Sequence, residues 1–373
     1  MMKKKILIYN DCRQWGGHEL MTIEIANTLA DVFDVYFCYF NDKFESHLLP
    51  GVKKIKIPVR SRLSYGGLGS FDFKDVRFLV GLFKDISPSF IVVSQGVIEL
   101  GLKALWAAKI ARIKVVSYIP LCFPFSLMNS PLARIRDIFG SLYYKTFDAF
   151  ITISEEQLRY LREKAHYQET YILENPMTIT PGMYRPLRRA APRIPKIGII
   201  GRINFLHKGQ DLAIQTARCL RARKKKINFD VVGDGEDKTK LERLIREHNL
   251  EDSFVIKKWS EDKKRIYSDL DSLLITSHFE GVPLVLLESI AFNKPVFAPL
   301  KGVFQEYLPR DFLYSSSDEL TEKLSNFGNY WELWRKQGKG IFKGMARKHG
   351  RRNYRKNLIS IMGNLDPVGD SGK

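Results

Sequence analysis

The sequence is poor in cysteine and has no long hydrophobic run. Its four cysteines are scattered, with no Cys-x-x-Cys pair among them: Cys12, Cys38, Cys122 and Cys219. We therefore expect reduced thiols in a cytoplasmic protein, with no metal site. No apolar stretch approaches the ~18 residues that a membrane-spanning helix needs, and the short apolar run at residues 6–9 predicts a first buried strand instead of a signal peptide.

The sequence has fewer acidic than basic side chains. The 373 residues include 60 Lys and Arg against 41 Asp and Glu, which gives a net charge of +19. Such an excess favours acidic partners, whether nucleic acid, an anionic membrane surface or a phosphorylated substrate, and it selects none of them alone. A basic nucleic-acid-binding or non-catalytic α/β protein remains the alternative, although most aromatic residues fall within the apolar runs and the charges are spread.

The sequence also lacks the glycine fingerprint of a dinucleotide-dependent oxidoreductase. That class requires Gly-x-Gly-x-x-Gly directly after a first strand. Neither WGGHE at residues 15–19 nor GIIGRI at residues 198–203 supplies the motif. We therefore do not expect an enzyme of this class.

Length and pattern predict two α/β domains. Short apolar runs alternate with helical patterns over residues 4–165, a proline-rich segment follows at 176–195, and the alternation then restarts. We expect an N-terminal acceptor-binding domain at residues 1–178 and a nucleotide-sugar-binding domain at 179–335. C-terminal helices at 336–373 are expected to pack back on the N-terminal domain and to end in a frayed tail.

The segment at residues 277–299 combines an apolar helix with two carboxylates. The helix is expected to begin near Pro283, because proline is tolerated in the first helical turn. Its body is apolar except for Glu288, a carboxylate that needs bonding partners when buried. Glu280 lies just before the helix, where first-turn N–H groups attract anions. Carboxylates beside an anion site suit the hydroxyls and phosphates of a sugar nucleotide.

Two basic residues follow the first strand of the second domain. Arg202 leaves the strand end after Gly201, and Lys208 precedes the next helix, in the frame GR-x5-KG-x-D. Two cations that enter a cleft could neutralise a departing diphosphate in place of a divalent metal.

In the first domain, Gly16 and Gly17 join the first strand to its helix, ahead of His18 and Glu19. Paired glycines let backbone N–H groups approach a ligand closely at a helix start. The alternatives are an ordinary tight turn and a histidine that is only a polar surface group.

Together these segments resemble the retaining nucleotide-sugar glycosyltransferases of family 4, which have the GT-B fold. The resemblance rests on EGVPLVLLES at residues 280–289 with NKPVFAPLKGVFQEYL after it, on the GR-x5-KG-x-D frame, on GG-x-E, and on the GDG turn at 233–235. It covers most of the second domain and, more weakly, the first. It implies an α/β protein with two Rossmann-like doubly wound parallel-sheet domains facing a central cleft, a UDP- or GDP-linked sugar donor, no cofactor and no metal.

The resemblance also implies roles for individual residues. Arg202 and Lys208 would bind the diphosphate, and Glu280 would meet the donor sugar near its reacting carbon; these three are the expected catalytic residues. Glu288 would accept hydrogen bonds from the ribose hydroxyls. The expected donor-binding residues are Gly16, Gly17, Arg202, Lys208, Lys258, Glu280, Gly281, Val282, Leu284 and Glu288.

The sequence departs from the family pattern at two places. Lys258 stands where the family commonly has a glycine near the base of the nucleotide. The run at residues 116–121 lacks the histidine that many members carry close to the acceptor, so His18, Glu19 and Tyr118 are the expected acceptor-binding residues. Same-face attack, in which the departing phosphate takes the acceptor proton, would tolerate that absence.

We therefore expect an enzyme that moves a sugar to a saccharide or lipid-linked acceptor in cell-surface polysaccharide or lipopolysaccharide synthesis. Its expected partners are the nucleotide-sugar donor, the acceptor and an anionic membrane surface, with no nucleic acid. The helix predicted at residues 130–147 suits the inner face of a membrane, because it has apolar residues with arginines among them, although such a helix more often faces the core. These residues are Leu132, Arg134, Ile135, Arg136, Ile138, Phe139 and Leu142.

Overall fold

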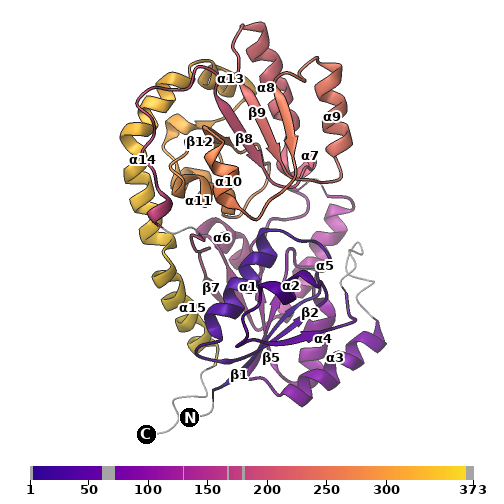
Figure 1. Cartoon of the computed structure of the whole chain (residues 1–373). Helices are drawn as coiled ribbons and strands as arrows, with labels where there is room; N and C mark the ends of the chain where they lie inside the picture. The colour runs from indigo at the N-terminus through magenta and orange to yellow at the C-terminus, as the bar shows by residue number, and fades with distance from the viewer. Residues whose placement is uncertain (1–2, 61–71, 129, 166–167, 179–180, 367–373) are drawn as a thin grey trace. The chain divides into compact units, whose positions relative to one another are not determined.

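The chain is described here from a computed structural model that covers residues 3–60, 72–128, 130–165, 168–178 and 181–366. It divides into two compact units (Figure 1). The first unit comprises Met1–Asn175 together with Arg352–Lys373, and the second comprises Pro176–Arg351. Each unit is built on a parallel sheet, as the alternating pattern predicts.

The first unit contains a seven-stranded sheet in the order β3-β2-β1-β4-β5-β6-β7, with every strand parallel to its neighbours. The central strands are buried apolar runs, typical of a sheet covered on both faces. The order reverses between β1 and β4, so the carboxyl ends of these two strands flank the position where such sheets bind ligands. The strands are β1 (Lys5–Asn10), β2 (Asp34–Tyr39), β3 (Lys53–Lys56), β4 (Phe90–Ser94), β5 (Lys114–Tyr118), β6 (Ala149–Thr152) and β7 (Glu169–Ile172).

Helices connect these strands. Ser154 is the N-cap of α6 and accepts a hydrogen bond from Gln157 N at 3.3 Å. The connecting helix α4 begins later than the apolar pattern predicts, because Gly101 is in the left-handed region with φ of 69°. The helices of this unit are α1 (Gly17–Leu29), α2 (Lys43–His47), α3 (Phe73–Ile86), α4 (Leu102–Ala111), α5 (Ala133–Thr146), α6 (Glu155–Lys164) and α15 (Arg351–Leu365).

The second unit contains a six-stranded parallel sheet in the order β10-β9-β8-β11-β12-β13. Its order reverses between β8 and β11, which places the expected ligand position at the carboxyl ends of these two strands. The strands are β8 (Lys196–Ile200), β9 (Asn228–Val232), β10 (Phe254–Lys257), β11 (Ser272–Leu274), β12 (Val296–Pro299) and β13 (Leu313–Tyr314).

The helices of the second unit form two groups. α8 contacts α9 and α13, while α11 contacts α14, and the sheet lies between the two groups in Figure 1. The predicted apolar helix is α11, and Pro283 stands at its N-cap. The helices are α7 (Phe205–Lys208), α8 (Asp211–Ala222), α9 (Lys238–Glu247), α10 (Lys263–Ser268), α11 (Leu284–Ala291), α12 (Phe304–Tyr307), α13 (Ser317–Ser325) and α14 (Phe327–His349), with 3-10 turns at Pro181–Met183 and Arg310–Phe312.

The two C-terminal helices belong to different units. The domain boundary predicted at residue 335 falls inside α14, and the whole of this helix belongs to the second unit. The last helix, α15, belongs almost wholly to the first unit and buries five side chains there: Tyr354, Leu358, Ile361, Met362 and Leu365. The predicted frayed tail lies mostly outside the described residues. In the described ranges, no helix combines the length and apolarity needed to cross a bilayer.

Candidate functional site

Two strand ends of the second unit meet at glycines. Gly233 has φ of 158°, and a Cβ added there would overlap the carbonyl oxygen of Gly201. A Cβ at Gly235 would overlap the carbonyl oxygen of Ile203 in the same way. The GDG turn after β9 therefore needs glycine because it packs directly against the backbone that follows β8.

The loop after β8 carries both predicted cations. Asn204 caps α7 by accepting a hydrogen bond from His207 N at 2.7 Å, and Gln210 Nε2 donates to Arg202 O at 2.8 Å. Arg202 is exposed just beyond the strand end. Thr276 Oγ1, at the end of β11, donates to Lys208 O at 2.5 Å. These bonds hold the loop against the carboxyl end of β11, where Glu280 follows.

The structure brings two predicted catalytic side chains into contact. Lys208 Nζ donates to Glu280 Oε1, and Ser277 Oγ donates to the same oxygen at 2.7 Å. Glu280 is partly exposed, with 12% of its side chain accessible, and Lys208 is 30% accessible. The pair lies where the strand order reverses, between β8 and β11.

Glu288 is buried in α11, and its partners belong to the protein. Tyr267 OH donates to Oε2 at 2.8 Å, and Lys263 Nζ lies 3.3 Å from Oε1. Burial raises the pKa of Glu288 above its ordinary value, while Lys263 and Tyr267 act to lower it. Lys263 Nζ also lies 3.9 Å from the centre of the exposed Trp259 ring.

Sequence reasoning missed Tyr267 and Lys263. The ribose hydroxyls were expected to satisfy the buried carboxylate of Glu288, whereas α10 already supplies two protein partners. A signal was present, because Lys263 and Tyr267 stand four residues apart, the spacing that places two residues on one face of a helix.

The remaining predicted donor residues lie around the N-terminus of α11 and at the sheet edge. Gly281 and Val282 are buried and Leu284 is half-buried, and no side chain caps the helix. Leu286 N donates to Pro283 O at 3.0 Å, and the earlier N–H groups of this uncapped helix start favour an anion. Lys258 is exposed directly after the edge strand β10, and within the described residues it forms no hydrogen bond or ion pair with the other predicted residues.

In the first unit, His18 lies at the reversal between β1 and β4. His18 Nε2 is 2.9 Å from Ser94 Oγ, which in turn is 2.5 Å from Thr22 Oγ1. The His18 ring stacks on Tyr118, with centroids 5.7 Å apart. Burial lowers the pKa of His18, so the imidazole is neutral at pH 7. His18 is therefore an ordered, half-buried group and not a solvated surface histidine.

The other predicted first-unit residues lie in the same loop and at the end of β5. Glu19 is 5% exposed and Tyr118 is 1% exposed. Gly16 is extended, with φ of −172°, so its backbone conformation does not require glycine; Gly17 is the first residue of α1. Sequence reasoning missed Ser94 and Thr22, although Ser94 ends a predicted strand.

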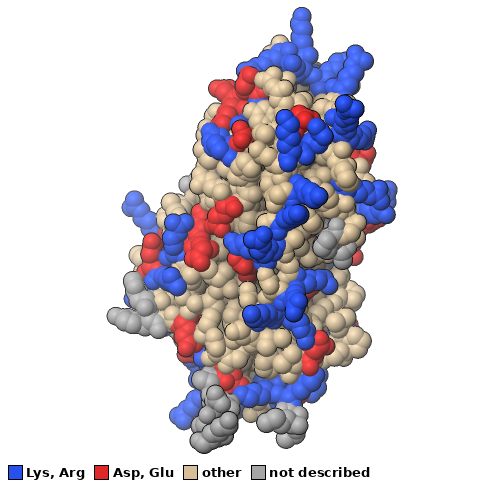
Figure 2. Space-filling view, turned by 90° about the vertical axis from the view of Figure 1, so that its left-hand side faces the viewer, with Lys and Arg blue, Asp and Glu red and all other residues tan. Residues whose placement is uncertain are grey.

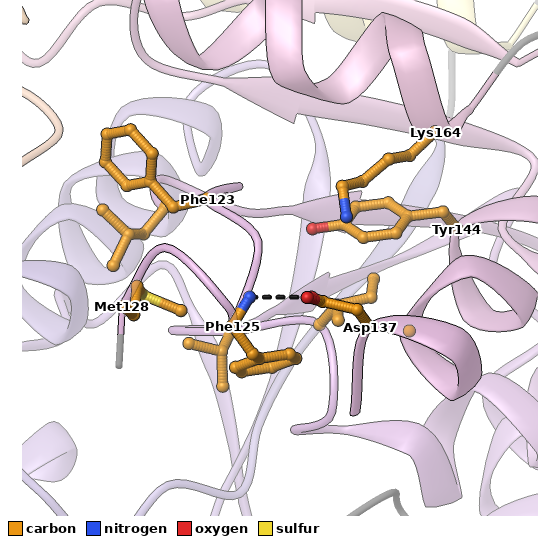
Figure 3. Close-up of a pocket in the computed structure, with 10 residues that line it drawn as sticks. Phe123, Phe125, Met128, Asp137, Tyr144 and Lys164 are labelled. Atoms are coloured by element: carbon orange, nitrogen blue, oxygen red, sulfur yellow. Dashed lines mark hydrogen bonds between the residues drawn. The ribbon is translucent and has the colours of Figure 1, made fainter. Parts of the chain in front are cut away.

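A hollow lies beside the loop that follows β5 (Figure 3). Asp137 of α5 fixes this loop by accepting hydrogen bonds from Phe125 N at 2.7 Å and Ser126 N at 3.1 Å. None of the residues that line this hollow is a predicted site residue. The lining is mainly apolar: Val97, Ile98, Leu121, Phe123, Phe125, Met128, Asp137, Gly140, Tyr144 and Lys164.

Basic side chains occur along the whole face drawn in Figure 2, with acidic ones between them.

Comparisons with known proteins give the class of this chain. Residues 189–319, which include Arg202, Lys208, Glu280 and Glu288, match the family model "Glycosyl transferases group 1". An uncharacterized glycosyltransferase of Haemophilus influenzae is 25% identical over 284 residues, 76% of each chain. The lipopolysaccharide 1,6-galactosyltransferase of Salmonella typhimurium is 26% identical, over 75% of this chain and 76% of its own length.

Solved structures resemble the chain along nearly its whole length. Anabaena Alr3699/HepE in complex with UDP-glucose has a TM-score of 0.77 at 18% identity, covering 96% of this chain and 99% of its own. The lipopolysaccharide outer core galactosyltransferase WaaB has a TM-score of 0.68 at 18% identity, covering 97% and 99%. At these identities the likeness establishes the fold, the GT-B fold of two Rossmann-like parallel-sheet domains, which confirms the sequence prediction.

The chain therefore carries a group 1 glycosyltransferase domain in its second unit. It is a glycosyltransferase, and thus an enzyme, with homologues in polysaccharide and lipopolysaccharide synthesis.

Proposed function

We propose that this enzyme transfers a sugar from a UDP- or GDP-linked donor to a saccharide or lipid-linked acceptor, with retention of anomeric configuration and without a metal ion. The relatives' names support a role in cell-surface polysaccharide or lipopolysaccharide synthesis, since they include an amylovoran biosynthesis enzyme and a lipopolysaccharide galactosyltransferase. The solved neighbours that contain UDP or UDP-glucose support a nucleotide-sugar donor.

The observation that carries the proposal is the Lys208–Glu280 pair beside Arg202 at the reversal between β8 and β11. Arg202 and Lys208 would hold the diphosphate and supply the two positive charges that a metal ion would otherwise bring. Glu280, with the backbone of Gly281, Val282 and Leu284, would contact the sugar. On binding, the diphosphate would share the Lys208 ammonium with Glu280, which leaves the carboxylate able to accept sugar hydroxyls.

Glu288 would accept the ribose hydroxyls with lone pairs that Tyr267 and Lys263 leave available. A carboxylate has about four acceptor sites, and the protein occupies two of them. Lys258, directly after β10, would lie close to the base of the donor nucleotide.

In the first unit, Gly16 and Gly17 would face the donor phosphates, while His18, Glu19 and Tyr118 would contact the acceptor. His18 Nδ1 supports this role, because it is buried and has no hydrogen-bond partner among the described residues. The departing phosphate would take the acceptor proton, so the scheme needs no further side-chain base.

The proposal is tested by incubating the purified protein with a panel of UDP- and GDP-linked sugars and measuring slow donor hydrolysis, with and without EDTA. Lys208→Ala should lower kcat/KM for the accepted donor at least about a hundredfold, a loss of about 2.7 kcal/mol in transition-state stabilisation. Lys196→Ala is the matched control: it removes a lysine–carboxylate pair, Lys196 Nζ to Asp269 Oδ1 at 2.8 Å, at the opposite end of the same strand β8.

The proposal fails if no donor is bound or hydrolysed, or if the two lysine variants are equally active. Loss of activity in EDTA would overturn metal independence. NMR of the first product formed from an α-linked donor reports the anomer, and a β-linked product would overturn retention.

A further inference from the structure

The helix α5 packs on the first unit with its polar side. Arg136 is buried and forms an ion pair with the buried Glu99, with Nη2 2.7 Å from Oε2 and Nε 3.1 Å from Oε1. Its guanidinium also lies 3.8 Å from the centre of the Phe125 ring. Gly140 and Tyr144 complete the inward side. A charged pair and small or aromatic residues thus anchor the helix, where an amphipathic helix ordinarily places its aliphatic residues.

The aliphatic residues of α5 are exposed instead. Three of them, at spacings of three and four residues, lie along one side of α5, and the fourth stands at its N-cap. We call them the α5 ridge; they are Leu132 (56% exposed), Ile135 (47%), Ile138 (71%) and Leu142 (54%). Leu127, in the turn before the helix, is 51% exposed as well. Folding leaves this apolar surface in water, and an exposed apolar patch of a few hundred Å² is often functional.

The charges beside the α5 ridge are positive. Arg134 and Lys145 are exposed on the flank of the same side, and in the part of the chain that the structure describes neither has a carboxylate partner. The single acidic residue of α5, Asp137, is occupied by the N–H groups of Phe125 and Ser126. The exposed surface of this helix therefore combines aliphatic side chains with unneutralised cations.

We infer that the α5 ridge docks on an anionic lipid bilayer, with its leucine and isoleucine side chains in the headgroup–acyl boundary and Arg134 and Lys145 on lipid phosphates. A second copy of the chain fits less well. The ridge offers on the order of 400 Å² of apolar surface, well below the ~800 Å² that each partner contributes to a stable interface, and its cations would face each other across a two-fold axis. The phosphates of anionic lipids complement both features of the surface.

The α5 ridge is held in place by contacts within the protein, without any membrane. The Arg136–Glu99 pair holds the helix, and the bonds to Asp137 tie the preceding loop to it. Docking therefore needs no folding transition, and its ordering cost is small. The inference deepens the proposed function, on which it rests only for the lipid-linked acceptor, because vesicle binding is measured without any nucleotide sugar.

The test is co-sedimentation of the full-length protein with phosphatidylcholine vesicles and with vesicles that also contain phosphatidylglycerol. The wild type should bind the anionic vesicles at least about tenfold more tightly than the neutral ones. The double variant Ile135→Ser/Ile138→Ser should weaken that binding at least about tenfold, with unchanged melting temperature and unchanged donor hydrolysis in solution. The double variant Arg134→Gln/Lys145→Gln should reduce the preference for anionic vesicles.

The matched control is Phe78→Ser/Ile110→Ser, which removes two other exposed apolar side chains of the first unit, 44% and 60% accessible. It should bind vesicles as the wild type does. Equal or negligible binding of the wild type to both vesicles would overturn the inference, as would wild-type binding by the ridge variant. A dimer in light scattering that the ridge variant dissociates would show an interface between copies instead. A protein that binds vesicles but hydrolyses no donor would contradict the proposed function alone.

Discussion

At the residue scale, Glu288 is a buried carboxylate whose partners, Tyr267 and Lys263, both come from α10. Its raised pKa means that the folded state holds the carboxyl proton more tightly than the unfolded chain does. The contribution of this proton to the free energy of unfolding is fully present below pH 4.5, the ordinary pKa of a glutamate side chain. It is lost as the pH rises through the higher pKa of Glu288 in the folded state. At pH 7, therefore, Glu288 contributes less to the free energy of unfolding than it does below pH 4.5, and ligand binding offers a reason for its presence.

Glu288→Gln should separate folding from binding. The neutral amide keeps the shape and removes the cost of a buried charge, so we expect an equal or higher melting temperature at pH 7 and no stability loss above pH 4.5 from this group. Nucleotide affinity should fall at least about tenfold, because the amide cannot accept both ribose hydroxyls beside Tyr267 and Lys263. Calorimetric unfolding and titration with nucleotide measure the two effects; unchanged affinity would contradict the ribose assignment.

The site residues were predictable from sequence only in part. The positions of Glu280, Arg202 and Lys208 after strand ends were predictable because strand ends and helix starts can be recognised locally, and their roles stay predictions. The direct pairing of Lys208 with Glu280 was not predictable, since it depends on which strands are neighbours across 72 residues of chain. The stacking of His18 on Tyr118 was missed for the same reason.

At the element scale, Asn293 sets the turn from α11 to β12. It adopts a left-handed conformation, with φ of 56°, its Nδ2 donates to Arg185 O at 2.8 Å, and its Oδ1 accepts from Trp334 Nε1 of α14 at 3.0 Å. Gly338 lies against this bond, and a Cβ there would be 2.7 Å from Trp334 Nε1 and 2.8 Å from Asn293 Oδ1. The glycine thus allows α14 to pack closely on the helix that contains Glu288.

Two glycines of α14 should respond in opposite directions to the same substitution. Gly338→Ala should lower the free energy of unfolding by about 1–3 kcal/mol, because the new methyl group crowds a buried hydrogen bond. Gly340→Ala, which meets nothing within 4 Å, should raise it by about 0.5–1 kcal/mol through helix propensity. Urea denaturation of both variants measures the difference, and equal effects would show that α14 does not pack as described.

Long, periodic elements were predictable and short ones were not. The helix expected to begin near Pro283 is α11, which begins at Leu284, and the amphipathic sequence of residues 73–86 forms α3. The strand β7, the five-residue helix α2 and the two-residue strand β13 were missed, because tertiary pairing rather than their own sequence makes them regular.

At the scale of the whole molecule, the C-terminal residues of the chain form part of the first unit, together with the N-terminal residues. α15 joins the first unit, where Arg355 Nη1 lies 3.0 Å from Asp31 Oδ2 and Lys4 Nζ lies 3.0 Å from Asp366 Oδ2. The Arg355–Asp31 pair is exposed and contributes little, and Lys4 is exposed while Asp366 is mostly covered, so the buried apolar side chains of α15 provide most of the attachment. The alternating pattern predicted two α/β units, but the break between α14 and α15 was not predicted, since both helices carry similar patterns.

Leu358→Ala should destabilise the first unit although the substitution lies near the C-terminus. Leu358 is fully buried, and the cavity left by truncation should cost about 2–5 kcal/mol. The exposed Lys356→Ala should stay within about 0.5 kcal/mol of the wild type. Hydrogen exchange followed by peptide should show faster exchange in β1 and α1 and unchanged exchange in β8 and α11 for Leu358→Ala. Faster exchange confined to the second unit would contradict the division of the chain.

The ion pair between Lys208 and Glu280 also bears on which solutes compete for the second unit. Inorganic phosphate would replace Glu280 as the partner of the Lys208 ammonium, but it has no sugar hydroxyl to replace the ammonium at Glu280, and its negative charge would repel that carboxylate. A sugar diphosphate supplies both replacements in one molecule. We therefore expect the empty enzyme to discriminate against simple phosphate anions, and millimolar orthophosphate to inhibit it far less than the nucleotide diphosphate product does.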